Sequence, residues 1–379
     1  MNGGSHAGWI FDDGWWITCK LDFRRWMVDH MQVGVFDDEW WITCKLDFRR
    51  WMVDHMQIYI YGAFALLRQI LQTHKKEEQR LHTGYVAIVT GGSAGIGFEV
   101  SRGLVSKNVH VVIGSRCIEE GKTAVAKIRE EYPNAKVDWL HIDLTSLKSV
   151  REFTDSFLAM GLPLNILINN AGIMFAPYQE TDDGLEEHFQ VNYLSHFYLT
   201  LLLLDVLKKT GTDNSYSRII NVSSVVHKLG NLDIDRLCSR YENSWEYSPH
   251  AAYSDSKLAI TVSSFMLGRK LNDENYKVTA NVLHPGVVRT SLYRHVHRSI
   301  KWFLDVVAIL LYKTPEMAAD TVLYLALSPN VEGDTGSYYD NCVKNKPHDS
   351  AHDRLLQEQL WHKSCEIIEH LTENELKHK

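Results

Sequence analysis

Short apolar runs alternate with helical patterns through the middle of the chain. The runs lie at 85–90, 109–114, 137–142 and 164–168, and helical spacing of apolar residues occupies the segments between them. A run of this length and composition is typical of a strand that is covered on both faces of a parallel sheet. Strands that alternate with helices favour right-handed crossovers. The pattern therefore predicts an α/β fold, with a single Rossmann-type doubly wound parallel sheet and helices on both faces.

The pattern continues in the second half of the chain. Further strands are predicted at 218–224 and 278–283, and a long helix begins near Tyr253 between them. We therefore expect one folded domain at 85–346. Apolar residues recur at helical spacing in the tail at 347–379, which predicts a C-terminal helix that covers either the core or the mouth of a pocket.

The first 57 residues have a different composition. Residues 11–32 and 36–57 are the same segment, differing only at Gly14 and Glu39, and they hold most of the tryptophans in the chain. Two copies are too few to bury a shared core. We interpret 1–57 as a duplicated Trp-rich segment, either a recent duplication or a gene-model artefact. The alternative is an interaction module in which the tryptophans anchor a membrane or a partner.

A hydrophobic stretch at 58–76 follows the repeat. It is largely uncharged and ends in His74, Lys75 and Lys76. Because a span needs about 20 apolar residues, this stretch predicts an N-terminal anchor helix, either an uncleaved signal-anchor or a helix lying in the membrane interface. The alternative is a helix packed on the domain.

The overall charge and the cysteines exclude some functions. The chain of 379 residues carries a net charge of −7, which argues against a nucleic-acid binder. Its six cysteines show no metal-ligand spacing. We therefore expect no nucleic-acid partner and no metal site.

A glycine-rich turn joins the first predicted strand to the helix that follows it. The residues that we expect to contact a dinucleotide here are Thr90, Gly91, Ser93, Gly95, Ile96 and Gly97. Glycines permit a tight turn and a close approach to the pyrophosphate, and the helix N-terminus stabilises its negative charge. Because strand, turn and helix occur together, the sequence predicts a dinucleotide cofactor.

The ends of the next two strands bear on the choice of cofactor. Arg116 follows the second strand, where a site specific for NAD usually has an acidic residue, and an arginine can pair with a 2′-phosphate. NADP(H) is therefore favoured and NAD(H) remains possible, the alternative being a solvated surface arginine. Asp143 and Leu144 end the third strand, where the aspartate can meet the adenine amino group.

Tyr253 and Lys257 form the candidate catalytic pair. Residues four apart on a helix lie on the same face, about 5–6 Å apart at Cβ. A fixed ammonium stabilises a phenolate, so this arrangement can lower the pKa of a tyrosine from its ordinary value near 10. The motif is weak alone and gains its weight from the glycine turn upstream.

Four motifs in this order resemble those of the short-chain dehydrogenase/reductase superfamily over about 85–327. They are Thr90-Gly91-x-x-x-Gly95-x-Gly97, Asn169-Asn170-Ala171-Gly172, Tyr253-x-x-x-Lys257 and Pro285-Gly286. The resemblance implies hydride transfer with Tyr253 as acid and base, Ser224 bonded to the substrate oxygen, and Asn192 completing a proton relay. Ser223 is the alternative to Ser224.

The same resemblance implies further contacts with the cofactor and a quaternary state. The residues implied beside the nicotinamide half are Asn170, Ala171, Gly172, Tyr253, Lys257, Pro285, Gly286 and Val288, and Thr290 is implied on the phosphate side. Paired long helices at Asn192 and Tyr253 imply a possible homodimer.

Two inserts are expected to shape the substrate pocket. One is the loop at 225–252, and the other is the basic and then apolar stretch at 290–313. The second insert predicts a lid that dips into a membrane surface, or otherwise an ordinary core helix. The resemblance extends to the polyprenol-oxidising branch of the superfamily, with retinol dehydrogenases as near relatives.

These features together imply a lipophilic substrate and a location at a membrane. The resemblance implies the interconversion of polyprenol and polyprenal and the reduction of dolichal, at the endoplasmic reticulum or at lipid droplets. Reduction of retinal or of another lipophilic carbonyl is the first alternative. A cofactor-binding membrane adaptor without turnover is the alternative outside enzymology.

Overall fold

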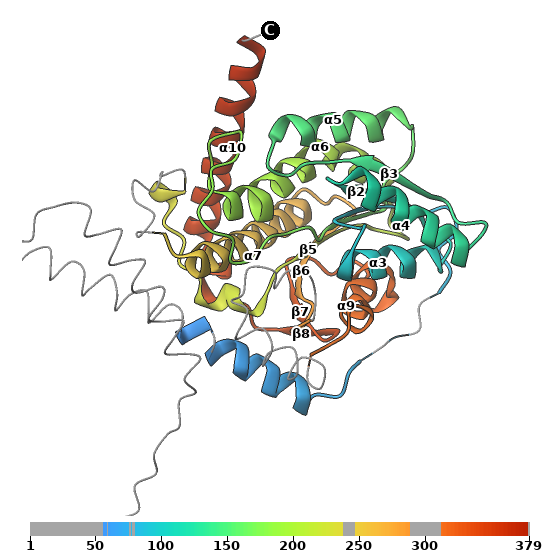
Figure 1. Cartoon of the computed structure of the whole chain (residues 1–379), viewed down its shortest axis with the longest axis horizontal. Coiled ribbons are helices and arrows are strands. Elements are labelled where there is room, and N and C mark those ends of the chain that lie inside the picture. The colour runs from blue at the N-terminus through green and yellow to red at the C-terminus, as the bar shows by residue number, and fades with distance from the viewer. Residues whose placement is uncertain are drawn as a thin grey trace, which may run out of the picture.

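The computed structural model describes residues 56–58, 60–75, 77, 80–237, 247–288 and 312–377 (Figure 1). The described residues form one eight-stranded sheet with the order β3-β2-β1-β4-β5-β6-β7-β8. Its strands are β1 (Val86–Thr90), β2 (His110–Ser115), β3 (Val137–His141), β4 (Ile166–Asn169), β5 (Ser217–Val222), β6 (Val278–His284), β7 (Tyr338–Asp340) and β8 (Val343–Asn345). The strands pair in parallel except β7 and β8. This confirms the predicted doubly wound sheet, with an antiparallel edge strand that the pattern did not predict.

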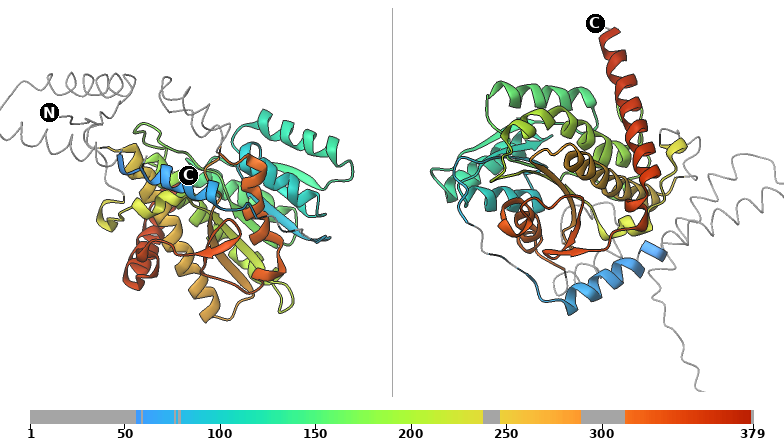
Figure 2. Two further views of the ribbon diagram at one scale, coloured as in Figure 1. Left: turned by 90° about the horizontal axis from the view of Figure 1, so that it is seen from below. Right: turned by 180° about the vertical axis from the view of Figure 1, so that it is seen from behind.

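Helices cover both faces of the sheet (Figures 1 and 2). They are α3 (Gly95–Val105), α4 (Ile118–Glu131), α5 (Leu147–Ala159), α6 (Ser195–Thr210), α7 (Pro249–Asp273), α9 (Pro315–Leu327) and α10 (Arg354–Lys377). One buried cluster joins one face of the sheet to α3, α4 and α9. The other joins the opposite face to α5, α6, α7 and α10. The sheet is therefore buried on both sides, as its apolar strands require.

Most predicted elements lie close to their observed bounds, and two differences have a physical cause. Apolar spacing predicts a helix only from Thr123 to Glu131, but α4 begins at Ile118. The first turn of α4, with Glu119 and Glu120, is exposed and therefore carries no buried apolar spacing. The strand predicted at 218–224 ends at Val222. The two serines after it therefore leave the sheet and turn toward α7.

The C-terminal helix α10 covers the core. Leu360 is fully buried, the ring of Trp361 packs edge-on against Phe197 of α6 at 4.9 Å, and the Ser364 hydroxyl bonds that of Tyr193. Helix α10 lies against α7 and α5, and its far end projects beyond the body of the protein in Figure 1. Of the two positions expected for this helix, the structure shows the one over the core. The homodimer stays a prediction.

A helix precedes the sheet at residues 56–58 and 60–71, and it lies along the margin of the molecule below β7 and β8 in Figure 1. Two contacts near its C-terminal end hold it to the domain. The His74 ring lies 2.8 Å from the Asp320 carboxylate, and the Asn341 amide donates to the carbonyl of Thr73. The expected helix therefore forms, and one side of it packs on the domain. None of the helices in the described ranges is both long and apolar enough to cross a bilayer.

Candidate active site

The glycine turn after β1 has no room for side chains. Gly91 and Gly95 have φ values of +64° and +54°, a region that favours glycine. A Cβ added to Gly97 would lie 2.2 Å from the Gly91 carbonyl oxygen and 2.5 Å from the Asn170 amide nitrogen. The turn therefore brings bare backbone to the surface at the carboxyl end of β1.

The hydroxyl of Thr90 ties this turn to the end of β4. It accepts from the backbone N–H groups of Asn170 at 2.9 Å and Ala171 at 3.1 Å. The Asn170 side chain in turn donates to the Thr90 carbonyl. The imidazole of His196, a residue that the sequence did not single out, lies 2.9 Å from the same hydroxyl. These bonds hold together the two strands at which the order of the sheet reverses, where doubly wound folds bind ligands.

Helix α3 begins at this turn without a side-chain cap. Its N-cap residue is Ala94, so no side chain accepts from the first N–H groups of the helix. Ser93, Gly95 and Ile96 line a cavity of about 510 Å³ beside these groups. Free N–H donors, a helix dipole and glycines that admit no side chain fit the pyrophosphate of a dinucleotide. The residues present therefore suit the cofactor that the sequence predicts.

The residues expected at the adenosine end lie outside the lining of this cavity. Arg116 is exposed directly after β2. The Asp143 carboxylate accepts from the backbone N–H and the hydroxyl of Thr145, and the Leu144 carbonyl accepts from the Ser195 hydroxyl. The three residues follow β2, which pairs with β1, and β3, which lies beyond β2 in the sheet. They thus stand on the side of the glycine turn where an adenosine would lie.

Tyr253 lies in the second turn of α7, which Ser248 caps and Pro249 begins. The Tyr253 side chain is buried, and burial raises its pKa to about 12, although its hydrogen bond with Ser224 acts in the opposite direction. In the protein alone, burial therefore raises the pKa of Tyr253, whereas the sequence predicts that Lys257 lowers it. A protonated tyrosine in contact with Ser224 is ready to donate to a carbonyl oxygen.

Lys257 lies one helical turn after Tyr253, and its ammonium is 5.8 Å from the centre of the Tyr253 ring. It donates to the Val222 carbonyl at 3.1 Å. Burial lowers its pKa to about 8, so the group is still mainly charged at neutral pH. The lysine therefore brings a positive charge close to the tyrosine from the floor of the cavity.

Asn192 lies in a π-helical segment, η1 (Phe189–Leu194), just before α6. Its amide oxygen accepts from the backbone N–H of Ile173 at 2.8 Å, and its amide nitrogen donates to the Ser256 hydroxyl at 2.9 Å. A Cβ added to Gly172 would lie 2.9 Å from the Asn192 amide oxygen and 3.5 Å from the Lys257 ammonium. Asn192 and Lys257 thus converge on Gly172, and single π-turns of this kind are frequent at functional sites.

The two serines after β5 have different surroundings. The Ser223 hydroxyl is buried and donates to the Lys257 carbonyl, with Thr261 also in reach. The Ser224 hydroxyl bonds Tyr253. The geometry therefore places Ser224 beside the phenol and assigns Ser223 to the packing of α7 on the sheet.

The wall of the cavity beside Tyr253 is apolar. Ile58, Met174 and Val226 form a buried cluster with the Tyr253 ring, and Phe175 packs edge-on against that ring at 5.3 Å. The sequence did not place Ile58 at the site, because its helix was expected either as an anchor or as a helix packed on the domain, with no position beside the cavity. The available signal was the small residues Gly62 and Ala63, about one helical turn after Ile58 on the same side of the helix.

A second turn closes the cavity after β6. Pro285, Gly286 and Val288 all line it, and Gly286 has a φ of +102°. The Gln69 side chain and the backbone of Lys313 both bond to Val287 inside this turn. Gln69, like His196 and Ile58, is a residue that sequence analysis missed.

Some expected features lie outside the described residues. Thr290 and nearly all of the insert at 290–313 are among them, as are residues 238–246 of the other insert and residues 1–55 of the Trp-rich repeat. The lid and the repeat therefore stay predictions.

Comparisons with known proteins agree with this geometry. A family model described as short chain dehydrogenase matches residues 85–234. Polyprenol dehydrogenase from Homo sapiens is 41% identical over 82% of this chain and 94% of its own length. The chain belongs to the short-chain dehydrogenase family. Retinol dehydrogenase 13 from Homo sapiens is 37% identical over 82% of this chain and 92% of its own length.

A solved structure has the same fold and holds a cofactor of the predicted class. The complex of Pseudomonas aeruginosa RhlG with NADP has a TM-score of 0.55 and 25% identity, over 68% of this chain and 94% of that one. This short-chain dehydrogenase is accordingly an NAD(P)-dependent alcohol dehydrogenase or carbonyl reductase. The adaptor alternative is thereby set aside.

Proposed function

We propose that this enzyme interconverts a long-chain isoprenoid alcohol and its aldehyde, reducing polyprenal and dolichal. The observation that carries the proposal is the apolar wall of Ile58, Met174 and Val226 around the buried Tyr253. A polar substrate would lose hydration against this wall without gaining hydrogen bonds. An apolar chain gains about 25 cal/mol for each Å² that it buries. The identity with a polyprenol dehydrogenase supports the same substrate class.

The proposed proton transfer uses the contacts around Tyr253. When bound, the nicotinamide supplies a hydride to the carbonyl carbon or accepts one from the alcohol. In reduction, Tyr253 donates its proton to the carbonyl oxygen, while Ser224 donates a hydrogen bond to that same oxygen. Their mutual hydrogen bond sets both hydroxyls at one point in the cavity.

Lys257 and Asn192 prepare Tyr253 for the next turnover. The charge of Lys257, 5.8 Å from the ring centre, stabilises the phenolate left after proton donation. Asn192 holds the turn at Ile173 by two side-chain hydrogen bonds. In this proposal it also orders the water that returns a proton toward Lys257 and Tyr253.

The proposed cofactor contacts follow the two halves of the site. The pyrophosphate is held by Thr90, Gly91, Ser93, Gly95, Ile96 and Gly97, with Thr290 reaching the phosphate side. The nicotinamide half is held by Asn170, Ala171, Gly172, Pro285, Gly286 and Val288. Asp143 and Leu144 flank the adenine. The exposed guanidinium of Arg116 pairs with the 2′-phosphate, so NADP(H) is preferred and NAD(H) is used less well.

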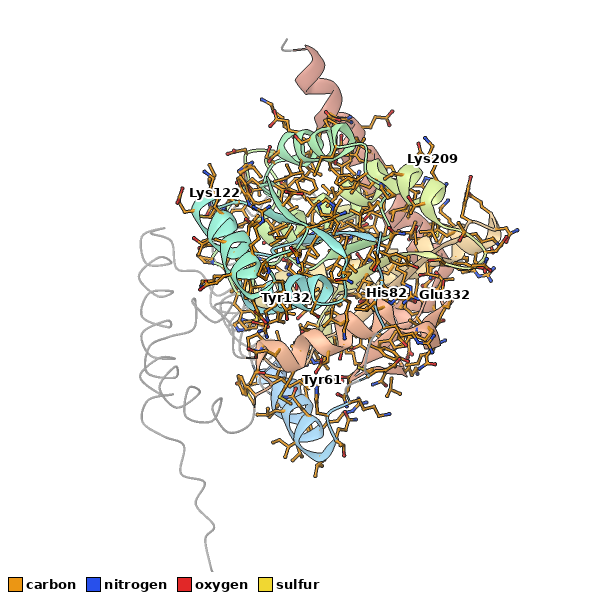
Figure 3. The ribbon with its side chains drawn as sticks, turned by 90° about the vertical axis from the view of Figure 1, so that its right-hand side faces the viewer. Tyr61, His82, Lys122, Tyr132, Lys209 and Glu332 are labelled. Carbon is orange, nitrogen blue, oxygen red and sulfur yellow. The ribbon has the colours of Figure 1, made fainter. Side chains whose placement is uncertain are left out.

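The helix at 56–71 is proposed to lie on a membrane surface. Ile60, Phe64, Leu67 and Leu71 recur along its outer side with 48% to 77% of each side chain exposed. Figure 3 labels Tyr61 on this helix at the edge of the molecule. A helix that is apolar on all sides needs cover on the outer side as well. We therefore propose that the enzyme associates with the endoplasmic reticulum or with lipid droplets. Flotation with phospholipid vesicles should be weaker for Phe64→Ser than for the unaltered chain. Equal flotation of the two would contradict the membrane position of this helix.

The decisive experiment is turnover by the full chain in detergent with polyprenal, dolichal and retinal, each with NADPH and with NADH. Preference for the long isoprenoids, and for NADPH, is expected. Retinal as the preferred substrate would leave the chemistry in place and support the second candidate, a retinal reductase, which the identity with retinol dehydrogenase 13 favours. A small polar carbonyl as the preferred substrate would overturn the proposal.

A further inference from the structure

The helix at 56–71 also has an inner side, which faces the active site. Ile58, Gly62 and Leu66 are four residues apart, which places them in one row along a helix. All three line the cavity that contains Tyr253 and Lys257, and Ala63 lies beside them. Ile58 is 6% exposed and belongs to the cluster around the Tyr253 ring. The row therefore forms one side of the cavity, and Ile58 joins it to Met174 and Val226.

Gly62 leaves a gap in this wall. A Cβ added at Gly62 would meet no atom of the described residues within 4 Å, so among them it would extend into open space. At Gly97, by contrast, the same addition meets backbone at 2.2 Å. The glycine at position 62 is therefore not required by crowding or by a positive φ. Since glycine inside a helix is less stable than alanine by about 0.5–1 kcal/mol, the open space is the one feature that its small size provides.

The wall is fixed relative to the reacting atoms at both ends. Ile58 packs in the cluster of Tyr253, and Gln69 bonds the turn at Val287 that borders the nicotinamide half of the cavity. A residue between these two contacts cannot move away from the cavity without breaking one of them. A larger side chain at position 62 would thus fill the cavity instead of displacing the helix.

We infer that this helix is the specificity wall of the substrate site and that Gly62 is a specificity-determining residue. The space beside Gly62 admits an apolar chain that continues past the carbonyl end, between the helix and Met174. This inference rests on the proposed function and refines it, because it states which residue admits the long chain.

The test compares Gly62→Leu with the unaltered full chain in detergent and NADPH. The substrates are a long polyprenal, retinal and the single-unit aldehyde 3-methylbut-2-enal. We expect kcat/KM for polyprenal to fall by about tenfold or more, since groups of a few carbons change specificity by this factor. For the single-unit aldehyde, kcat/KM of Gly62→Leu should stay within about threefold of the value for the unaltered chain. NADPH binding, measured by fluorescence, should be unchanged.

Two further variants make the comparison decisive. Gln57→Leu adds the same side chain at an exposed position of the helix outside the lining of the cavity, and it should leave all three substrates unaffected. Gly62→Ala adds one methyl group, and its kcat/KM for polyprenal should fall by less than that of Gly62→Leu. It serves as the test if Gly62→Leu melts at a lower temperature than the unaltered chain.

The outcomes separate the two proposals. If kcat/KM of Gly62→Leu falls equally for the large and the small aldehyde, or falls for neither, Gly62 does not determine specificity. Preference of the unaltered enzyme for retinal would overturn the proposed substrate while the role of Gly62 is still measured with retinal. An unaltered enzyme that reduces only the single-unit aldehyde would overturn both.

Discussion

The side-chain amide of Gln69 pairs with both backbone groups of Val287. It donates to the Val287 carbonyl at 3.3 Å and accepts from the Val287 N–H at 2.8 Å. A Cβ on the neighbouring Gly286 would lie 2.8 Å from the Gln69 amide oxygen, so the contact depends on that glycine. A helix that precedes the sheet is thus bonded to a turn beside the catalytic cavity, more than 200 residues later in the chain.

Replacing Gln69 should disturb this turn. In Gln69→Ala both bonds to Val287 are lost, and we expect kcat to fall by about threefold to tenfold with a smaller change in KM for the aldehyde. Gln69→Glu still accepts from the Val287 N–H but cannot donate, so its kcat should lie between those of the unaltered enzyme and Gln69→Ala. Steady-state kinetics separate kcat from KM, and Gln72→Ala, at an exposed residue on the same segment, is the control. A change in melting temperature alone, with kcat intact, would reduce Gln69 to a structural contact.

Tyr253→Phe removes the proton donor and keeps the ring in its apolar cluster. Turnover should fall by at least about 10³-fold, because Tyr253 supplies the proton in the proposed mechanism and Ser224 supplies only a hydrogen bond. NADPH binding should persist. Tyr276→Phe, at an exposed tyrosine outside the cavity, should retain full activity. Activity of Tyr253→Phe within tenfold of the unaltered enzyme would exclude the proposed mechanism.

Gly97→Ala should abolish dinucleotide binding. The added methyl group cannot fit 2.2 Å from the Gly91 carbonyl oxygen, so the turn has to open. We expect the dissociation constant for NADPH, measured by fluorescence, to rise by about 100-fold or more. Gly62→Ala adds a methyl group in open space and is the matched control, with unchanged NADPH binding. Equal affinity in both variants would show that the pyrophosphate does not approach this turn.

Arg116 should determine the preference between the two nucleotides. Arg116→Glu places a negative charge where a 2′-phosphate is expected, so kcat/KM for NADPH should fall by about tenfold or more while that for NADH holds or rises. Lys122, labelled in Figure 3, is exposed on α4, and Lys122→Glu makes the same change of charge. The same NADPH to NADH ratio in both variants would mean that Arg116 is a solvated surface residue.

Buried histidines should make the fold sensitive to acid. Burial lowers the pKa values of His196 and His284 to about 4 from 6.5. Between these values the unfolded chain binds more protons than the folded one, so stability is complete above pH 6.5 and falls as the pH drops toward 4. One such histidine contributes about 3 kcal/mol when the effect is fully developed.

Melting temperatures between pH 7.5 and 4.5 check this prediction. His196→Gln should flatten the loss at low pH, although the substitution also removes the contact with Thr90 and lowers stability at every pH. His141→Gln changes an exposed histidine at the end of β3 and should leave the slope of melting temperature against pH unchanged. Parallel curves for the two variants would assign the acid sensitivity to other groups.

The sequence alone determined the first six strands of the sheet, the glycine turn and the order of the catalytic motifs. These features depend on local rules, since a buried strand needs a run such as Val86–Thr90 and a tight turn at Gly91 needs glycine. Their spacing along the chain was sufficient to predict the family to which the comparisons assign it. The start of α4 could not be predicted, because its polar first turn gives no apolar period.

Only the tertiary structure decided which distant residues meet. The choice between Ser223 and Ser224 depends on where β5 ends relative to α7. A shift of one residue along a strand turns a side chain to the opposite face. The burial that raises the pKa of Tyr253 likewise comes from the packing of separate elements. The largest addition is the helix at 56–71, whose Ile58 and Gln69 join the site through contacts made across the chain. An apolar pattern indicates that a helix needs cover, but the partner that covers it is set by the packing of the whole molecule.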